Sequence, residues 1–170
     1  MKRALHGAII LSVTLPLCIA AQGSSAELKD FTRMLKAADG LQVSLVHLNA
    51  KTLPLLFQAP TLYQMRARAY QSTLLYVQGT TQRDVELDTS LFTLEQDGQS
   101  TAGGTTNIKN FRQGTVAKGS QVDGVLEFSI RVDLSRVFTV THGSDSVEFK
   151  FNERQVKEAT PPPAPAAPQN

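Results

Sequence analysis

Residues 122–132 read Val-Asp-Gly-Val-Leu-Glu-Phe-Ser-Ile-Arg-Val, and this stretch decides the predicted fold. Apolar residues such as Leu126 and Phe128 alternate with polar or charged ones such as Glu127 and Arg131. Successive side chains of a strand point to opposite faces, so this period of two predicts a strand with one buried and one largely solvated face. Val125 is the apolar exception on the polar side.

Shorter segments with strand-like patterns lie on both sides of this stretch. We predict strands at 41–48, 73–78, 83–87, 91–96, 108–111 (with Val116 nearby), 137–142 and 147–151. Residues 143–146 read Gly-Ser-Asp-Ser and supply the turn that joins the last two strands as a hairpin. Short strands whose connections are too short for helices indicate a mainly β domain over residues 40–157. We expect an immunoglobulin-like antiparallel β-sandwich.

The segment before this domain favours a helix. Ser24 and Glu27 have capping-box spacing, and the apolar residues that follow recur at helical period: Leu28, Phe31, Leu35 and Ala38. We therefore predict an N-terminal helical segment over 22–39, ended by the turn residues Asp39 and Gly40. The alternative is a strand that pairs with 41–48 through this same turn.

Residues 49–70 are predicted to form a long, partly helical connection. Pro54 and Pro60 interrupt any strand, and Thr61 can cap a short helix that continues through Ala69. The connection is unusually apolar for a loop. Its apolar residues either pack as a lid over the open end of the sandwich or form a partner-binding surface. The predicted partner-binding residues are Leu55, Leu56, Phe57, Tyr63 and Met65.

A group of strand and turn residues resembles a known family. The residues that carry the resemblance are Phe92-Thr93-Leu94, Asp97-Gly98, Lys118-Gly119 and Gly124-Val125-Leu126-Glu127-Phe128. They resemble the telokin-like immunoglobulin-fold domains of bacterial exported proteins and lipoproteins, over residues 72–151. The resemblance implies the fold and the compartment. It implies no catalytic residues, and a fold alone does not give a function.

The first 21 residues are typical of a secretory signal peptide. Lys2 and Arg3 precede an apolar run over 8–17, which is too short to span a bilayer as a helix. Small residues follow, with cleavage expected after Ala21 or after Ala26. Cys18 leaves lipid anchoring as an alternative, which bulky Leu17 before it disfavours. We expect an exported protein, periplasmic or extracellular, with no membrane span after cleavage.

The other end of the chain is rich in proline and alanine. Residues 158–170 are predicted to be a disordered tail, because proline fixes φ and lacks a backbone donor. Whether this tail is a spacer or a peptide that a partner recognises stays open.

Composition disfavours several classes of function. The chain has 17 Lys and Arg against 15 Asp and Glu, and losing Lys2 and Arg3 would leave the two signs equal. There is no polybasic run, so nucleic acid is not an expected partner. The single cysteine, Cys18, falls in the predicted signal, so the domain is expected to fold without disulfides.

No motif predicts catalysis or a cofactor. His47 and His142 fall on separate predicted strand ends, where structural roles are expected, and no Gly-x-Ser-x-Gly motif accompanies them. The glycine-containing stretch 99–104 is expected to be a mobile loop; it precedes a predicted strand, whereas a phosphate loop precedes a helix. The acidic row Asp84, Glu86 and Asp88 is expected to be a solvated, protective strand face, with calcium as the alternative.

These observations lead to a functional hypothesis. We expect an exported, non-enzymatic β-sandwich that acts as an interaction or structural module in the cell envelope, with a protein partner and without cofactor or metal. The alternative is a sandwich that binds a small ligand, a sugar or a metal through its loops. A pocket lined by converging polar groups would favour this alternative.

Overall fold

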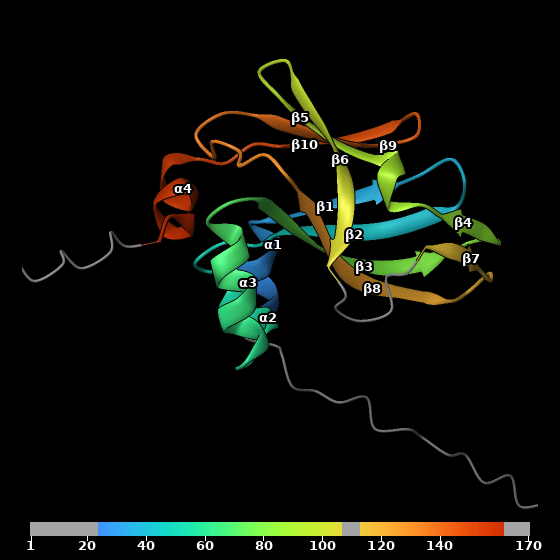
Figure 1. Ribbon diagram of the computed structural model, residues 1–170, viewed down its shortest axis with the longest axis horizontal. Coiled ribbons are helices and arrows are strands. Elements are labelled where there is room, and N and C mark those ends of the chain that lie inside the picture. The colour runs from blue at the N-terminus through green and yellow to red at the C-terminus, as the bar shows by residue number, and fades with distance from the viewer. Residues whose placement is uncertain (1–23, 107–112, 162–170) are drawn as a thin grey trace, which may run out of the picture.

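The computed structural model describes residues 24–106 and 113–161, and this part of the chain is mainly β (Figure 1). Its ten strands are β1 (Thr32–Lys36), β2 (Leu41–His47), β3 (Thr73–Thr81), β4 (Val85–Leu87), β5 (Phe92–Gln96), β6 (Gln99–Thr106), β7 (Gly114–Val116), β8 (Gln121–Phe128), β9 (Phe138–His142) and β10 (Asp145–Phe149). The helices are α1 (Ser24–Lys29), α2 (Leu53–Leu56), α3 (Thr61–Ala69), α4 (Glu153–Ala159) and the 3₁₀ turn η1 (Thr89–Leu91).

Eight of the strands form one antiparallel sheet that folds over on itself. The strand order is β1-β2-β3-β8-β6-β5-β9-β10. The second half of β6, Gly103–Thr106, pairs with β8, whereas its first half, Gln99–Ala102, pairs with β5. β6 therefore belongs to both layers, and Figure 1 shows it (yellow) running from one to the other. The prediction of a mainly β, antiparallel and sandwich-like architecture is confirmed.

The two free edges of the folded sheet meet. The Arg33 guanidinium on β1 donates a hydrogen bond of 3.0 Å to the Lys150 carbonyl just after β10. The Ala38 N–H donates one of 2.7 Å to the Asp145 carboxylate. Arg33 also lies over the Phe149 and Phe151 rings, at 5.6 and 5.9 Å from their centroids. These side-chain contacts close the sandwich along the β1–β10 side.

The core lies between the two layers. Phe138 and Phe149 stack at 4.8 Å, and His47 from the other layer lies 5.9 Å from Phe138. On β8, Leu126 and Phe128 are fully buried, as predicted from the alternation. Val125 is also fully buried, and its register partner is Tyr76, which packs against Phe57 on the outer face of the sheet. The strand ends at Phe128, four residues earlier than predicted.

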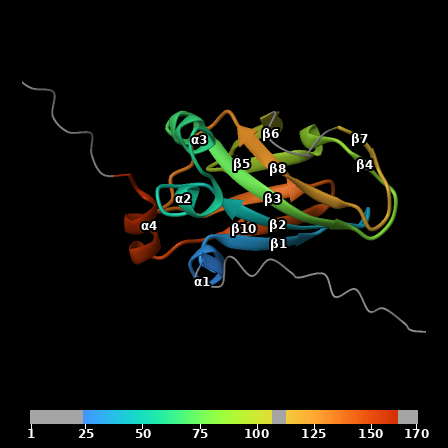
Figure 2. The ribbon, with the colours of Figure 1, turned by 90° about the horizontal axis from the view of Figure 1, so that it is seen from below.

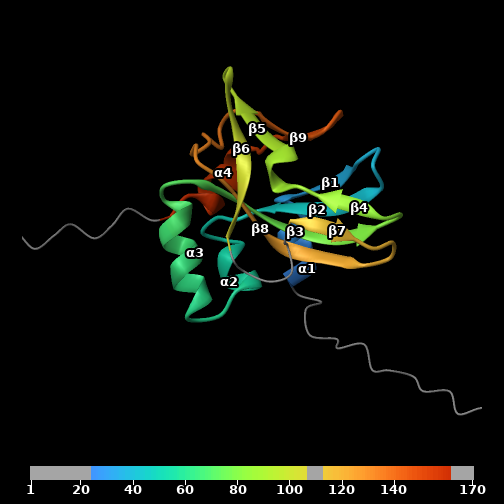
Figure 3. The same cartoon turned by 45° about the vertical axis from the view of Figure 1, so that its right-hand side comes forward.

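α2 and α3 confirm the partly helical 49–70 connection. They lie against the outer face of the β3–β8 layer, where Phe57 meets Tyr76 of β3 edge-on at 6.0 Å. Arg68 on α3 pairs with Glu127 on β8 at 2.6 Å. Figures 2 and 3 show that α2, α3 and α4 gather at one end of the sandwich and the β4–β7 ribbon at the other.

The predicted helix over 22–39 is wrong beyond α1. Residues 32–36 form β1, which pairs antiparallel with β2 through the turn at Asp39 and Gly40. This is the alternative prediction of a strand that pairs with 41–48. Gly40 has a φ of 98°, which suits glycine in a tight turn. Phe31 and Leu35 are four residues apart, a spacing that places side chains on one face of a helix and equally on one face of a strand.

The predicted loop over 99–104 is also wrong, because this stretch belongs to β6. Asp97 and Gly98 have φ values of 55° and 78°, so they make the two-residue hairpin turn that carries β5 directly into β6. Within β6, a Cβ on Gly103 would lie 3.0 Å from the Thr89 carbonyl and 3.3 Å from the Phe128 ring. Glycine therefore allows the close approach of β6 to its neighbours.

The predicted tail begins too early. Residues 153–159 form α4, which the sequence analysis did not predict, so Glu158 and Ala159 belong to the folded domain. Asn152 and Gln155 form a capping box at the start of α4. The predicted signal peptide, the predicted strand 108–111 and most of the tail lie outside the described residues. Within the described residues, no helix is long and apolar enough to span a membrane.

Candidate functional site

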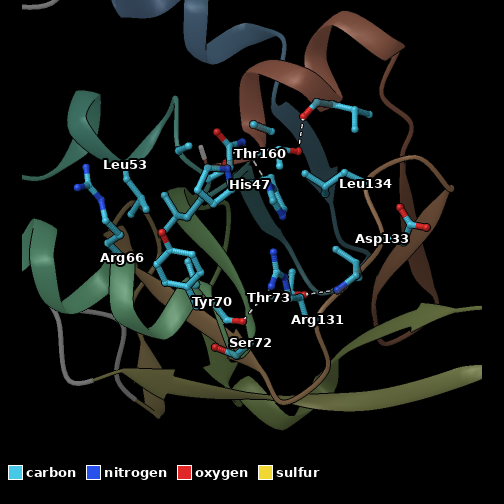
Figure 4. Close-up of a pocket in the computed structure, with 18 residues that line it drawn as sticks. His47, Leu53, Arg66, Tyr70, Ser72, Thr73, Arg131, Asp133, Leu134 and Thr160 are labelled. Atoms are coloured by element: carbon cyan, nitrogen blue, oxygen red, sulfur yellow. Dashed lines mark hydrogen bonds between the residues drawn. The ribbon is translucent and has the colours of Figure 1, made fainter. Parts of the chain in front are cut away.

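A pocket of about 580 Å³ lies at the end of the sandwich where the helices gather. Its wall comes from the end of β2, from α2 and α3, from residues 131–134 after β8, and from the last turn of α4 (Figure 4). Tyr70 is 48% exposed and Arg131 is exposed, so the pocket opens to solvent on their side.

His47, the last residue of β2, lines this pocket while its ring packs into the core. It lies 5.9 Å from Phe138 and 5.8 Å from Phe151. Burial lowers the pKa of His47 to about 4, because an imidazolium would lose its hydration there. The ring is therefore neutral at physiological pH.

The turn after β2 fixes the orientation of this ring. Asn49 Oδ1 accepts hydrogen bonds from the backbone N–H groups of Lys51 and Thr52, at 2.9 and 3.1 Å. This leaves Asn49 Nδ2 to face His47, where it donates to the His47 carbonyl and to Nδ1, each at 3.2 Å. Because Nδ1 accepts, the proton of the neutral ring is on Nε2.

Two guanidinium groups line the pocket. Arg131 donates one hydrogen bond, from Nη1 to the Tyr70 carbonyl at 3.2 Å. Arg66, from α3, is exposed and lies at another side of the pocket in Figure 4. Among the described residues, neither guanidinium forms an ion pair.

Among the described residues of the lining, Asp133 is the one carboxylate, and this carboxylate accepts its hydrogen bonds from Ser135, two residues later in the chain. Its Oδ1 accepts from the Ser135 N–H at 2.9 Å and from the Ser135 hydroxyl at 2.7 Å. These hydrogen bonds hold the pKa of Asp133 below its usual value, and the bond from the Ser135 hydroxyl has the largest effect. The positive charge of Arg136 lowers this pKa further. Figure 4 shows Asp133 at the side of the pocket, away from Arg131.

The Ser72, Thr73 and Thr160 hydroxyls of the wall are already bonded within the protein, whereas the Tyr70 hydroxyl has no hydrogen-bond partner among the described residues. Ser72 donates to the Arg68 carbonyl or to Glu127, and Thr73 donates to the Ile130 carbonyl at 2.7 Å. The Thr160 hydroxyl donates to the Val156 carbonyl at 2.8 Å. The remaining wall is aliphatic, with contributions from Leu53, Leu134, Val156 and Ala159.

The structure places the predicted partner-binding residues in two groups. Phe57 and Met65 are 6% and 1% exposed, so they pack under α2 and α3 as lid residues and cannot contact a partner in this structure. Leu55 and Leu56 are half-buried, whereas Tyr63 is 64% exposed. A docking surface over 49–70 would therefore contain only part of the predicted set.

His142 lies at the opposite end of the sandwich from His47. Its Nε2 is 2.8 Å from Asp39 Oδ2 in the β1–β2 turn, an interaction that the sequence analysis did not predict. Burial raises the pKa of Asp39, but hydrogen bonds from the Leu41 N–H and His142 outweigh this, so the pKa lies below its usual value. The pair joins the β1–β2 turn to β9.

The three carboxylates of the acidic row, of which only Glu86 lies within β4, accept hydrogen bonds from separate partners. Asp84 accepts from the Lys118 N–H at 2.8 Å, and Glu86 accepts from the Thr115 hydroxyl at 2.8 Å. Asp88 accepts from Ser90, whose hydroxyl is 2.7 Å away. Across residues 24–106 and 113–161, no group of three or more His, Cys, Asp or Glu side chains is arranged to hold a metal ion.

Most pocket residues could not be recognised from the sequence. Arg131 continues the strongest strand pattern and was assigned to a solvated face, and α4 was not predicted. A capping-box pattern at Asn152 and Gln155 was the one available signal for α4. Comparisons of the chain with protein-family models, with curated proteins and with solved structures found no match.

Proposed function

We propose that this chain is an exported, non-enzymatic β-sandwich of the cell envelope that binds a small ligand in the pocket at its helical end. The observation that carries the proposal is the pocket itself. Its volume of about 580 Å³ is typical of small-molecule sites, and polar groups from separate segments meet aliphatic walls in it. Ligand binding is thus favoured over the interaction module that the sequence alone suggests.

Binding without catalysis accords with the chemistry of the pocket. A general base has to exchange a proton near the working pH, and the pKa of His47 is lowered to about 4 by burial. The Ser72, Thr73 and Thr160 hydroxyls donate to protein oxygens, and none has a histidine as its partner among the described residues.

A protein-interaction module is the second candidate. It is favoured by the 64% exposure of Tyr63 on α3, since an exposed aromatic side chain is a common element of interfaces. The immunoglobulin-like type of the sandwich and its membership of the telokin-like family belong to the proposal as well. The positive φ values of Gly98 and Gly119, both 78°, support the turn positions on which the resemblance rests.

The pocket is tested by mapping small-molecule binding. We expect a library of apolar, anionic, cationic and sugar fragments to shift the NMR amide signals of Leu48, Ser72 and Val132. Ala69→Trp should remove these shifts, because Ala69 lines the pocket and an indole would fill it. Ala67→Trp is the matched control, since Ala67 is an exposed residue of the same helix outside the pocket lining.

Fragments that shift only residues around Tyr63, or shifts that Ala69→Trp leaves intact, would contradict the pocket proposal. The first of these results would favour the interaction module.

Export is tested on the protein from its own host. N-terminal sequencing of the envelope or secreted fraction should begin near Gln22 or Glu27, because signal peptidase cuts after small residues. A chain that begins at Met1 in the cytoplasm would refute export. A lipid-modified Cys18 would establish the lipoprotein alternative.

A further inference from the structure

We infer that the pocket takes a small amphipathic carboxylate, with the acid group at Arg131 and an aliphatic body along the wall formed by α2, α4 and Leu134. The inference rests on the proposed function and names its ligand class. It is carried by three features of the pocket: an unneutralised cation, an excess of donors over acceptors, and an aliphatic wall.

Of the two guanidinium groups in the lining, the proposed cation is Arg131, because a hydrogen bond holds it at the pocket and Arg66 makes none to a described residue. A guanidinium has five N–H donors, and among the described residues Arg131 uses one of its nitrogens, for the 3.2 Å bond to the Tyr70 carbonyl. That bond holds the group at the pocket without neutralising its charge. A carboxylate could accept two parallel N–H bonds from such a group.

The acid closest in sequence does not fill this role. The Asp133 carboxylate accepts both its hydrogen bonds from Ser135, and the guanidinium whose charge lowers its pKa is that of Arg136. Arg136 itself pairs with Asp97 at 2.6 Å, outside the pocket. The charge of Arg131 is therefore available to a ligand.

The second donor is His47. Its Nδ1 accepts from Asn49, so Nε2 carries the proton, and no residue that the structure describes accepts a hydrogen bond from Nε2. Asn49 uses its whole amide within the turn, and the Ser72, Thr73 and Thr160 hydroxyls donate to protein oxygens. The Tyr70 hydroxyl, which has no hydrogen-bond partner among the described residues, can donate or accept. The pocket thus offers the N–H donors of Arg131, Arg66 and His47 against one lining carboxylate, Asp133, which favours a ligand rich in acceptors.

The wall adds an apolar requirement. Leu53, Leu134, Val156 and Ala159 line the pocket, and Leu53 and Ala159 are each 2% exposed. α4 is held in place by the Lys51–Glu158 ion pair at 2.5 Å and by the 3.2 Å bond from the Ala50 N–H to the Ala159 carbonyl. An inorganic anion would leave this wall without contacts, whereas an alkyl chain would cover it.

The experiment compares three ligands with the same chain and different head groups: decanoate, decanol and decylammonium. Calorimetry on the full exported chain should rank decanoate first and decylammonium last. We expect decanoate to bind about 10- to 100-fold more tightly than decanol, the range typical of hydrogen bonds to a charged group. NMR shifts at Leu48 and Val132 should report all binding at the pocket.

Arg131→Gln should reduce decanoate affinity to that of decanol and leave decanol binding unchanged. Arg136→Gln is the matched control and should change neither, because Arg136 lies outside the pocket lining. Equal affinity for the three head groups would overturn the carboxylate inference and leave the pocket function standing. The carboxylate inference would also be overturned if none of the three ligands bound while other fragments still shifted the NMR signals of pocket residues. The pocket function itself would be refuted only if no fragment of the library gave NMR shifts that Ala69→Trp removes.

Discussion

Phe128→Ala is expected to lower the free energy of unfolding by about 3–5 kcal/mol, the usual cost of truncating a fully buried phenylalanine. Phe128 is 0% exposed and lies on β8, one of the two central strands of the folded sheet. Its register partners are Thr73 on β3 and Gly103 on β6. Gly103 has no side chain that could move into the space, and backbone on both sides is held by sheet hydrogen bonds. The cavity should therefore persist, which places the cost in the upper part of the range.

Urea unfolding monitored by circular dichroism measures this loss. Glu127→Ala, one residue earlier on the same strand, is the comparison. The sequence alone predicts less than about 0.5 kcal/mol for it, as for a solvated position. The structure adds the ion pair with Arg68 at 2.6 Å and a hydrogen bond from Ser72, so we expect up to about 1 kcal/mol. Similar losses for the two variants would contradict the register of β8.

The elements that the sequence predicted well are those whose pattern has one interpretation. The alternation along 122–132 fits only a strand, and β8 occupies its first part. Phe31 and Leu35, by contrast, share a face in either a helix or a strand, and only the pairing with β2 decides between them. The local pattern therefore could not reveal β1.

β6 was missed because it has few apolar residues. Its first half is held by backbone pairing to β5 and its second half by pairing to β8, and Gly103 allows close packing against Phe128. Such a strand depends on its neighbours, so propensity and periodicity do not detect it. The pocket could not be predicted for a similar reason. It depends on the tertiary fold, which brings together Arg131, His47 and Ala159 from three separate segments.

Acid should destabilise the protein through His47. The pKa of His47 is about 4 in the folded protein and about 6.5 in an unfolded chain, so the unfolded state binds the proton first as pH falls. The resulting loss of unfolding free energy is absent above about pH 6.5, grows as pH falls, and is complete below about pH 4. A difference of this size corresponds to about 3 kcal/mol. Unfolding free energies measured from pH 7 to pH 4 should show this loss.

His47→Phe removes the titrating group and keeps a ring between Phe138 and Phe151. Its absolute stability can differ, since Asn49 Nδ2 loses an acceptor, but its unfolding free energy should fall less steeply between pH 6.5 and 4. Carboxyl groups with lowered pKa values, such as Asp39, are present in both proteins and cancel in the comparison. An imidazole NMR titration of the wild type should give a midpoint near 4 for His47. Parallel stability curves, or a midpoint near 6.5, would show that this ring is solvated and would contradict its burial against Phe138 and Phe151.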